Sequence, residues 1–289
     1  MSNWAIWADP AVRAVIGGFS FALGAVIASF LNVVIWRVPR GESIVSPPSH
    51  CPKCNHAIRW YQNLPILSWL CLRGRCASCH APISPRYILI ETLGGVLFLA
   101  AFLRFGVSPA TPVLWIWISL MIVGSFIDFD HQLLPDFVTV GGMILGVAAA
   151  LADTVFAAYA GEWRFAWDWR TLLGSSLGWS LAGLSLGFTL LYLVRFCGSK
   201  AFGREAMGMG DVLLLGAVGA LFGPVAVVFT LVFSSVFGSL AGVGMMLLAK
   251  VRFGRFVAIP YGPFIALACL LWMFAGPEIV SWYLVMMHG

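Results

Sequence analysis

Long apolar runs dominate the chain, and most charged residues lie between these runs. Several runs reach the roughly 18–20 residues that a helix needs to cross a bilayer core. The short alternating segments of membrane β-barrels are absent from the sequence, so we expect an all-α integral membrane protein. We predict eight helical spans, at residues 14–36, 87–105, 112–128, 133–152, 171–194, 209–222, 224–249 and 258–285. The sixth span is short and ends at the turn signal Gly223-Pro224, so it could instead be re-entrant.

Composition supports a membrane protein and argues against a soluble one. Of the 289 residues, 61% are hydrophobic and 10% are charged, whereas soluble chains average about 25% charged residues. A soluble fold of this composition could not cover its surface with polar groups. The first apolar run, 14–36, lacks a basic start and is too long for a signal-peptide core, so we expect it to be a retained span.

The distribution of basic residues predicts the orientation. If all eight runs cross the bilayer, thirteen of the 17 Lys and Arg residues lie on one side, in the segments 37–86, 195–208 and 250–257. The positive-inside rule makes this side cytoplasmic. Both termini and the 153–170 loop are then expected on the outer side.

Four of the five cysteines in the segment 37–86 form pairs, and this segment is the only predicted loop large enough to form a small domain. Cys51 and Cys54 form one C-x-x-C pair, and Cys76 and Cys79 form another after 21 intervening residues. This spacing is typical of a zinc ribbon, in which two knuckles complete a tetrahedron of thiolates. Two disulfides are the alternative, but a cytosolic loop is expected to be reduced. Zinc suits a closed four-thiolate site, and iron is the other option.

This metal is expected to be structural, because four thiolates leave no open position for water or substrate. Folding of such a small domain would depend largely on the metal. We therefore expect three parts: a first span at 1–36, a cytosolic zinc-binding domain with four cysteine ligands at 37–86 and a membrane domain at 87–289. The remaining cysteines are expected to be packed apolar residues: Cys71, Cys197 and Cys269.

Acidic residues within apolar runs are candidates for function, because they are costly in a bilayer. Asp128 ends the third predicted span and Asp211 opens the sixth, so both are expected at the cytoplasmic edge. Two carboxyl groups that meet can share a proton, which supplies a general base for water and a general acid for the leaving group. Gly208 and Gly210 could allow unusual backbone angles and the close approach of a substrate strand.

Simpler structural roles remain open for these acids. Asp128 or Asp130 could cap the fourth span, Asp136 could cap it or form an ion pair, and Asp211 could be the N-cap of the sixth span. Glu91, one turn into the second span, could pair with an arginine or bind substrate.

Several motifs occur together along the chain. The segments concerned are 29–43, 46–51, 58–65, 74–79 and 83–87 in the N-terminal half, followed by Asp128-x6-Pro135-Asp136 and Gly208-Met-Gly210-Asp211. Together they resemble the type IV prepilin peptidases, also called prepilin leader peptidase/N-methyltransferases. The polar, tryptophan-rich loop 153–170 departs from the core pattern of that family.

The resemblance implies a bifunctional enzyme of the bacterial inner membrane, with both termini periplasmic. Such enzymes cut the basic leader of type IV prepilins or type II secretion pseudopilins after a Gly at the cytoplasmic face. They then methylate the new N-terminal residue, usually Phe, with S-adenosylmethionine. By motif, Asp128 and Asp211 match the catalytic aspartates and the four cysteines match the zinc ligands. Glu42 is a candidate for methyl transfer.

The methyltransferase activity rests on the resemblance alone, because the sequence contains no soluble-type glycine-rich cofactor loop. The expected partners are prepilin or pseudopilin substrates, the lipid bilayer and the pilus or secretion assembly machinery, without any nucleic acid. Two alternatives remain: a presenilin-like intramembrane protease, since Gly-x-Gly-Asp also occurs there, and a non-catalytic scaffold that recruits a secretion partner through its zinc ribbon.

Overall fold

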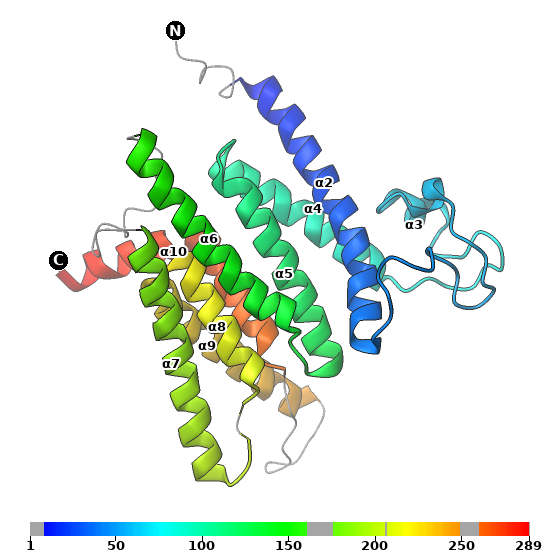
Figure 1. Ribbon diagram of the computed structural model, residues 1–289. Helices are drawn as coiled ribbons and strands as arrows, with labels where there is room; N and C mark the ends of the chain where they lie inside the picture. The colour runs from blue at the N-terminus through cyan, green and yellow to red at the C-terminus, as the bar shows by residue number, and fades with distance from the viewer. Residues whose placement is uncertain (1–8, 161–175, 206, 249–259, 289) are drawn as a thin grey trace. The chain divides into compact units, whose positions relative to one another are not determined.

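The computed structural model describes residues 9–160, 176–205, 207–248 and 260–288, and their regular secondary structure is helical apart from two isolated bridges (Figure 1). The helices are α2 (Pro10–Arg37), η1 (Val38–Arg40), η2 (Trp60–Asn63), α3 (Leu67–Cys71), α4 (Arg86–Phe105), α5 (Ala110–His131), α6 (Asp136–Ala160), α7 (Ser176–Phe202), α8 (Met209–Phe222), α9 (Pro224–Leu248) and α10 (Gly262–His288). The all-α prediction is confirmed for this part of the chain.

A helix occupies each of the eight predicted spans, and seven of these helices are long and apolar enough to cross a membrane. The exception is α8, with 14 residues. At 1.5 Å per residue it is about 21 Å long, which is shorter than the roughly 30 Å core of a bilayer. The first residues of the predicted spans 171–194 and 258–285 lie outside the described residues, as do the basic segment 250–257 and most of the loop 153–170.

Local signals in the sequence explain where several helices begin and end. The carboxylate of Asp9 accepts the N–H of Ala11 at 2.7 Å and so caps α2, with Pro10 as its first residue. Gly106 and Gly223 follow α4 and α8 with φ angles of 66° and 84°, a left-handed conformation that favours glycine.

The chain divides into two compact units, residues 1–123 and 124–289, with the division inside α5. In the first unit, α2 packs on α4 with backbones in close contact. A Cβ at Gly24 would lie 2.5 Å from the carbonyl oxygen of Gly94, and one at Gly94 would lie 2.5 Å from the Cβ of Ala28. Such small-residue crossings are typical of membrane helices, which gain much of their association energy from close packing.

Helix α8 is the central element of the second unit. It contacts α6, α7, α9 and α10, and ten of its 14 residues are buried. A Cβ at Gly183 of α7 would collide with the carbonyl of Gly219 in α8, and one at Gly187 would collide with that of Leu215. Because its surroundings are protein, α8 can end within the depth of the bilayer without exposing its backbone to lipid.

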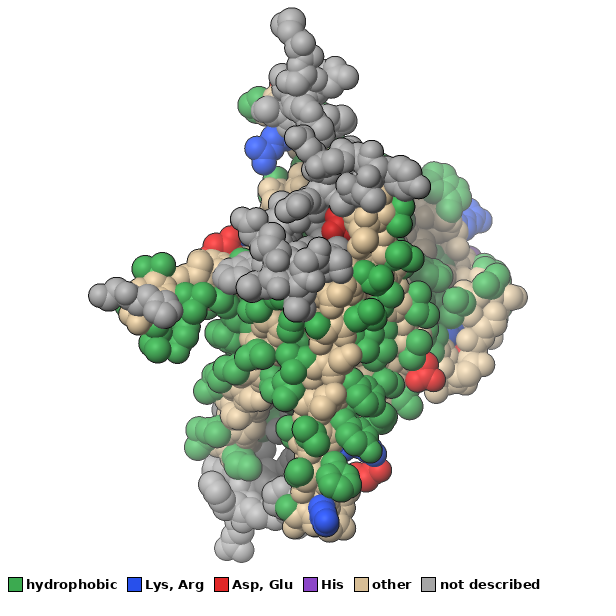
Figure 2. Space-filling view, turned by 60° about the vertical axis from the view of Figure 1, so that its left-hand side comes forward, with side chains coloured by type: hydrophobic (Ala, Val, Ile, Leu, Met, Phe, Trp, Pro, Cys, Tyr) green, Lys and Arg blue, Asp and Glu red, His purple; other side chains and the backbone are tan. Residues whose placement is uncertain are grey.

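The outer faces of the long helices carry large apolar side chains. Examples are Phe19 in α2 and Leu240 in α9, which are 63% and 66% exposed. Hydrophobic side chains predominate on the face shown in Figure 2, and charged ones are few. This surface suits contact with lipid rather than water.

Candidate active site and metal centre

Asp128 lies in the last turn of α5, within the second unit. Its side chain is 6% exposed, and Oδ2 accepts the N–H of Gly262, the first residue of α10, at 2.9 Å. Helix α6 begins only at Asp136. Asp128 is therefore not a cap of the fourth span. Its carboxyl group lies at the N-terminus of α10 instead.

Asp211 is the third residue of α8 and is 8% exposed. The N-cap is Gly208, so the idea that Asp211 is itself the N-cap is wrong. Its carboxyl group interacts with the backbone of Gly208. Within the part of the chain that the structure describes, its Oδ1 is buried without a hydrogen-bond partner. A buried carboxyl oxygen of this kind is costly, which is typical of functional sites.

The two carboxyl groups lie close enough for their charges to interact. Leu134 lies between α5 and α6. It packs against the start of α8 at Gly210 and against the start of α10 at Gly262, the two helix starts next to the carboxyl groups. A Cβ at Gly210 would be 2.8 Å from the Cβ of Leu134, and one at Gly262 would be 3.3 Å from its Cδ1. The carboxyl group of each aspartate therefore lies at a helix N-terminus, that of α10 for Asp128 and that of α8 for Asp211, where N–H groups without helical partners favour negative charge.

The two glycines before Asp211 do not have the unusual backbone angles that the sequence suggested. Gly208 has φ −67° and ψ 149°, an extended conformation that any residue adopts, and Gly210 is helical. The expectation of unusual backbone angles is therefore wrong. Gly210 is required by close packing, because a side chain there would collide with Leu134.

The other acids that the sequence singled out are placed differently. Asp130 and Asp136 are exposed in the second unit. In the first unit, Glu42 is exposed, whereas Glu91 is buried in α4. Oε2 of Glu91 accepts the N–H of Ile66 at 2.7 Å, so this carboxylate holds the start of α3.

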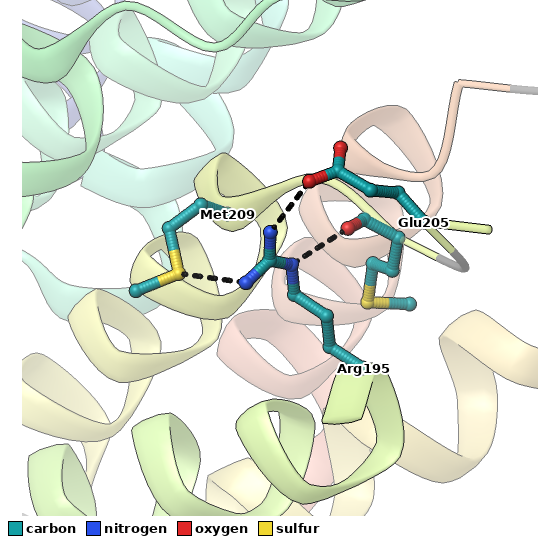
Figure 3. A network of polar contacts seen from close by, with 4 residues as sticks. Arg195, Glu205 and Met209 are labelled. Carbon is teal, nitrogen blue, oxygen red and sulfur yellow. Dashed lines mark hydrogen bonds and ion pairs between the residues drawn. The ribbon is translucent and has the colours of Figure 1, made fainter. Parts of the chain in front are cut away.

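Arg195, which the sequence offered only as a possible partner of Glu91, makes other contacts in the site region (Figure 3). From the last turns of α7, its guanidinium donates to the carbonyl of Met207 at 3.0 Å and pairs with Glu205 at 3.1 Å. It also lies 4.0 Å from the sulfur of Met209. These contacts hold the segment that leads into Asp211. An arginine within an apolar helix is the signal that could have identified it.

The four cysteines of the predicted zinc ribbon come together in the first unit. Their sulfur atoms all lie within 4.8 Å of one another, and those of Cys51 and Cys79 are 3.8 Å apart. Tetrahedral zinc with bonds of about 2.3 Å requires sulfur atoms about 3.8 Å apart. All seven cysteines are free, so the structure contains neither of the alternative disulfides. The donor set and its geometry fit a metal ion.

The two C-x-x-C segments have the same backbone conformation. The N–H of Cys51 donates to the carbonyl of His56 and that of Cys76 to the carbonyl of Ala81, both at 2.9 Å. Asn55 and His80, the residues after the second cysteine of each pair, both have φ 55°. N–H groups of Lys53 and Cys54 point at the sulfur of Cys51 and lower the pKa of this thiol to about 6. Thiolates held in this way are ready to bind a cation.

The remaining cysteines differ from expectation in two of three cases. Cys269 is buried in α10, which confirms the prediction of a packed residue. Cys71 and Cys197 are exposed, so their packing was predicted wrongly. Cys197 lies on α7, where an apolar thiol can face lipid as readily as protein.

Comparison with known proteins identifies the family. A profile described as "Bacterial Peptidase A24 N-terminal domain" matches residues 22–105, and one described as "Type IV leader peptidase family" matches residues 115–243. The chain is 36% identical to a protein of Aeromonas hydrophila named "Prepilin leader peptidase/N-methyltransferase", over 91% of this chain and 92% of that protein. The chain belongs to the type IV leader peptidase family.

Other members of the family differ in length. A protein of Escherichia coli O78:H11 named "Type 4 prepilin-like proteins leader peptide-processing enzyme" is 34% identical, over 84% of this chain and 88% of that protein. A Myxococcus xanthus protein named "Prepilin leader peptidase/N-methyltransferase" is 42% identical, but the aligned stretch covers only 64% of its length. No solved structure matches significantly. With its seven helices of membrane-spanning length, this family member is a multi-pass membrane protein.

Proposed function

We propose that the chain is a prepilin leader peptidase and N-methyltransferase. It cleaves type IV prepilins or type II secretion pseudopilins after a Gly and then methylates the new N-terminal residue. Asp128 and Asp211 are its catalytic pair. The observation that carries the peptidase proposal is that these two buried carboxyl groups lie close enough for their charges to interact, although their segments are far apart in the sequence.

The chemistry that the pair can perform follows from its arrangement. One carboxylate removes a proton from a water molecule, which attacks the scissile carbonyl carbon. The other carboxyl group, in its protonated form, gives a proton to the leaving amine. The N–H of Gly262 holds one oxygen of Asp128, so this carboxyl group keeps its orientation. Among the described residues, Oδ1 of Asp211 has no hydrogen-bond partner that would compete with water.

The methyltransferase proposal is supported by the named relatives that span most of this chain. S-adenosylmethionine would supply the methyl group, which passes to the free N-terminal amine. A prepilin of this type has a basic leader and an apolar helix. The helix can lie in the bilayer while the leader stays on the cytoplasmic side, where the basic residues of this chain also place the start of α8.

Zinc is the metal that we propose for the four cysteines, with a structural role in the cytosolic segment 37–86. We further propose a location in the inner membrane, with both termini periplasmic and the pair Asp128 and Asp211 at the cytoplasmic face. Gly208, Asp136, Glu91 and Glu42 stay candidates for supporting roles.

The test of the pair uses the purified protein and a prepilin substrate. Asp128→Asn and Asp211→Asn should each abolish cleavage, because either change removes a proton donor or acceptor while keeping the size of the side chain. Asp130→Asn is the matched control, since Asp130 is exposed two residues along the same helix, and it should cleave normally. Cleavage at the wild-type rate by either of the first two variants would show the assignment to be wrong.

The test of methylation is independent of cleavage. A synthetic peptide that already begins at the mature N-terminus should gain the mass of one methyl group in the presence of S-adenosylmethionine. The Asp128→Asn variant should methylate this peptide as the wild type does. If the wild type cleaves prepilin but never methylates the peptide, the chain is a peptidase only.

A further inference from the structure

The hydrogen bond between Gly262 and Asp128 depends on where α10 begins. The carbonyl of Tyr261 accepts the N–H groups of Phe264 and Ile265 at 3.0 and 3.2 Å, which makes Tyr261 the N-cap of α10. Gly262 is then the first helical residue, and its N–H has no partner within the helix. This N–H is the one that reaches Oδ2 of Asp128.

Gly262 has no room for a side chain. A Cβ at this position would be 2.7 Å from Oδ2 of Asp128, so the backbone itself lies directly against the carboxyl group. A small displacement of the start of α10 would therefore move the only hydrogen bond that the structure records for the Asp128 carboxyl group in the described part of the chain.

The side chain of Tyr261 fixes the start of α10 to α9. Its ring lies against Gly238, where a Cβ would be 3.7 Å from Cε2. Its hydroxyl oxygen is 2.7 Å from the hydroxyl of Ser234 and 3.3 Å from that of Ser235. Ser234 is fully buried in α9, where its hydroxyl also lies 3.2 Å from the carbonyl oxygen of Leu231, and either hydroxyl of the Tyr261–Ser234 pair can be the donor. Breaking this bond would take the Tyr261 hydroxyl away from the buried hydroxyl of Ser234, and a buried polar atom that loses a partner is costly.

We propose that the hydrogen bond from Tyr261 to Ser234 is a latch that keeps the Gly262 N–H on Asp128, so that Tyr261 and Ser234 are positioning residues of the peptidase. The predicted effect of the latch on cleavage rests on the proposed peptidase function. The predicted effect of the latch on the position of α10 does not depend on that function. The latch and the carboxyl group lie in the same compact unit, residues 124–289, and Tyr261 and Gly262 are adjacent in the chain.

The first experiment measures the latch without any substrate. Hydrogen–deuterium exchange is followed in the peptide that covers the first turns of α10, in wild type and in Tyr261→Phe. The variant keeps the ring on Gly238 and loses only the hydroxyl. Exchange in the first turn should become faster by ~10-fold, because the part-buried hydrogen bond that restrains this turn is gone. The control is Tyr283→Phe, an exposed tyrosine of the same helix, which should leave this peptide unchanged.

The second experiment measures prepilin cleavage. Tyr261→Phe and the pair Ser234→Ala with Ser235→Ala should each lower kcat by ~10-fold and leave KM within about twofold, because a misplaced catalytic group slows the chemical step without weakening substrate binding. Combining all three changes should be no worse than either alone, since each removes the same interaction. Ser281→Ala and Tyr283→Phe are the matched controls on α10 and should cleave normally.

The outcomes are distinguishable from a failure of the proposed function. If wild type cleaves and the Tyr261→Phe variant has the wild-type kcat, the latch proposal is wrong while the peptidase stands. Additive effects of the two sets of changes, or faster exchange throughout the second unit, would also overturn it. If wild type does not cleave, the proposed function fails, and unchanged exchange at the start of α10 then overturns the latch separately. Local acceleration of exchange with a lower kcat supports it.

Discussion

At the scale of single residues, the site is built from side chains and from places where a side chain is missing. Asp128 and Asp211 supply the carboxyl groups, and the helix starts around them are glycine-containing segments. Gly210 and Gly262 both lie against Leu134, and Gly262 also lies against Asp128. The spacing of Asp128 and Asp211 therefore depends on Leu134 and on the absence of side chains at Gly210 and Gly262, as well as on the aspartates themselves.

A methyl group added at Gly210 should disturb this spacing. In Gly210→Ala the new Cβ would be 2.8 Å from that of Leu134, so the first turn of α8 must shift and carry Asp211 with it. We expect kcat for prepilin cleavage to fall by ~10- to 100-fold, the range for misplaced catalytic groups. The measurement is steady-state cleavage in detergent.

The chain provides a control and a rescue for this variant. Gly141 of α6 has nothing within 4 Å of its Cβ position, so Gly141→Ala should leave cleavage intact and add about 0.5–1 kcal/mol of helix stability. Adding Leu134→Ala to Gly210→Ala removes the colliding side chain and should recover part of the activity. No loss in the single variant would mean that Leu134 does not set the spacing.

At the scale of elements, each unit has short segments held by a few polar contacts. In the second unit, Arg195 fixes the segment before α8, and α8 itself is enclosed by four helices. In the first unit, Glu91 of α4 holds the N–H of Ile66, whose φ of 64° is unusual for a β-branched residue. The two knuckles of the cysteine cluster are the other fixed point of this unit.

Removing the carboxyl group of Glu91 should loosen α3. Glu91→Ala leaves the Ile66 N–H without its acceptor, which costs about 1.5–3 kcal/mol for a hydrogen bond to a charged group. Limited proteolysis between residues 60 and 75 should become faster. Glu91→Gln retains an acceptor oxygen and should be cut at a rate nearer to wild type. Equal protection in Glu91→Ala would show that Ile66 does not depend on this contact.

Removing the metal should unfold the cysteine segment and spare the second unit. We expect about one zinc per chain by elemental analysis, since four thiolates form one closed site. Cys76→Ser should lose the metal and expose the 37–86 segment to protease, because metal binding supplies much of the folding free energy of such a segment. Thermal unfolding of the second unit should not change. Loss of zinc with a protected segment would argue against a structural role.

At the scale of the whole molecule, the distribution of charge and apolar surface governs the relation to the membrane. Seven helices are long enough to cross, and the short α8 is followed at once by α9 after Gly223. The predicted orientation requires that α8 and α9 both cross the bilayer, so that the start of α8 and the end of α9 lie on the same side.

Reporter fusions should verify this orientation. Alkaline phosphatase is active only outside the cytosol, so a fusion after residue 165 should be active and fusions after residues 80 and 205 should be inactive, following the positive-inside rule. A green fluorescent protein fusion at each position should give the opposite pattern. Activity of the phosphatase fused after residue 80 would place the cysteine segment outside and invert the proposed topology.

The sequence by itself determined the helical class, the approximate places of eight helices and the identity of the chemical groups, although α6 and α7 end eight residues beyond the predicted spans. These features are local: apolar runs of sufficient length form helices in a bilayer, and C-x-x-C pairs form knuckles from their own backbone hydrogen bonds. The aspartates could be singled out for a related reason, since a charged group in an apolar run is costly wherever the chain folds.

Only the tertiary structure decided what surrounds these groups. That Asp128 meets the start of α10 at Gly262, that Gly210 is needed because of Leu134, and that Tyr261 is tied to Ser234 depend on residues far apart in the sequence. The same holds for the exposure of Cys71 and Cys197, which a polarity pattern cannot foresee. Contacts between distant segments are set by how helices pack, and a single sequence carries no direct signal of packing.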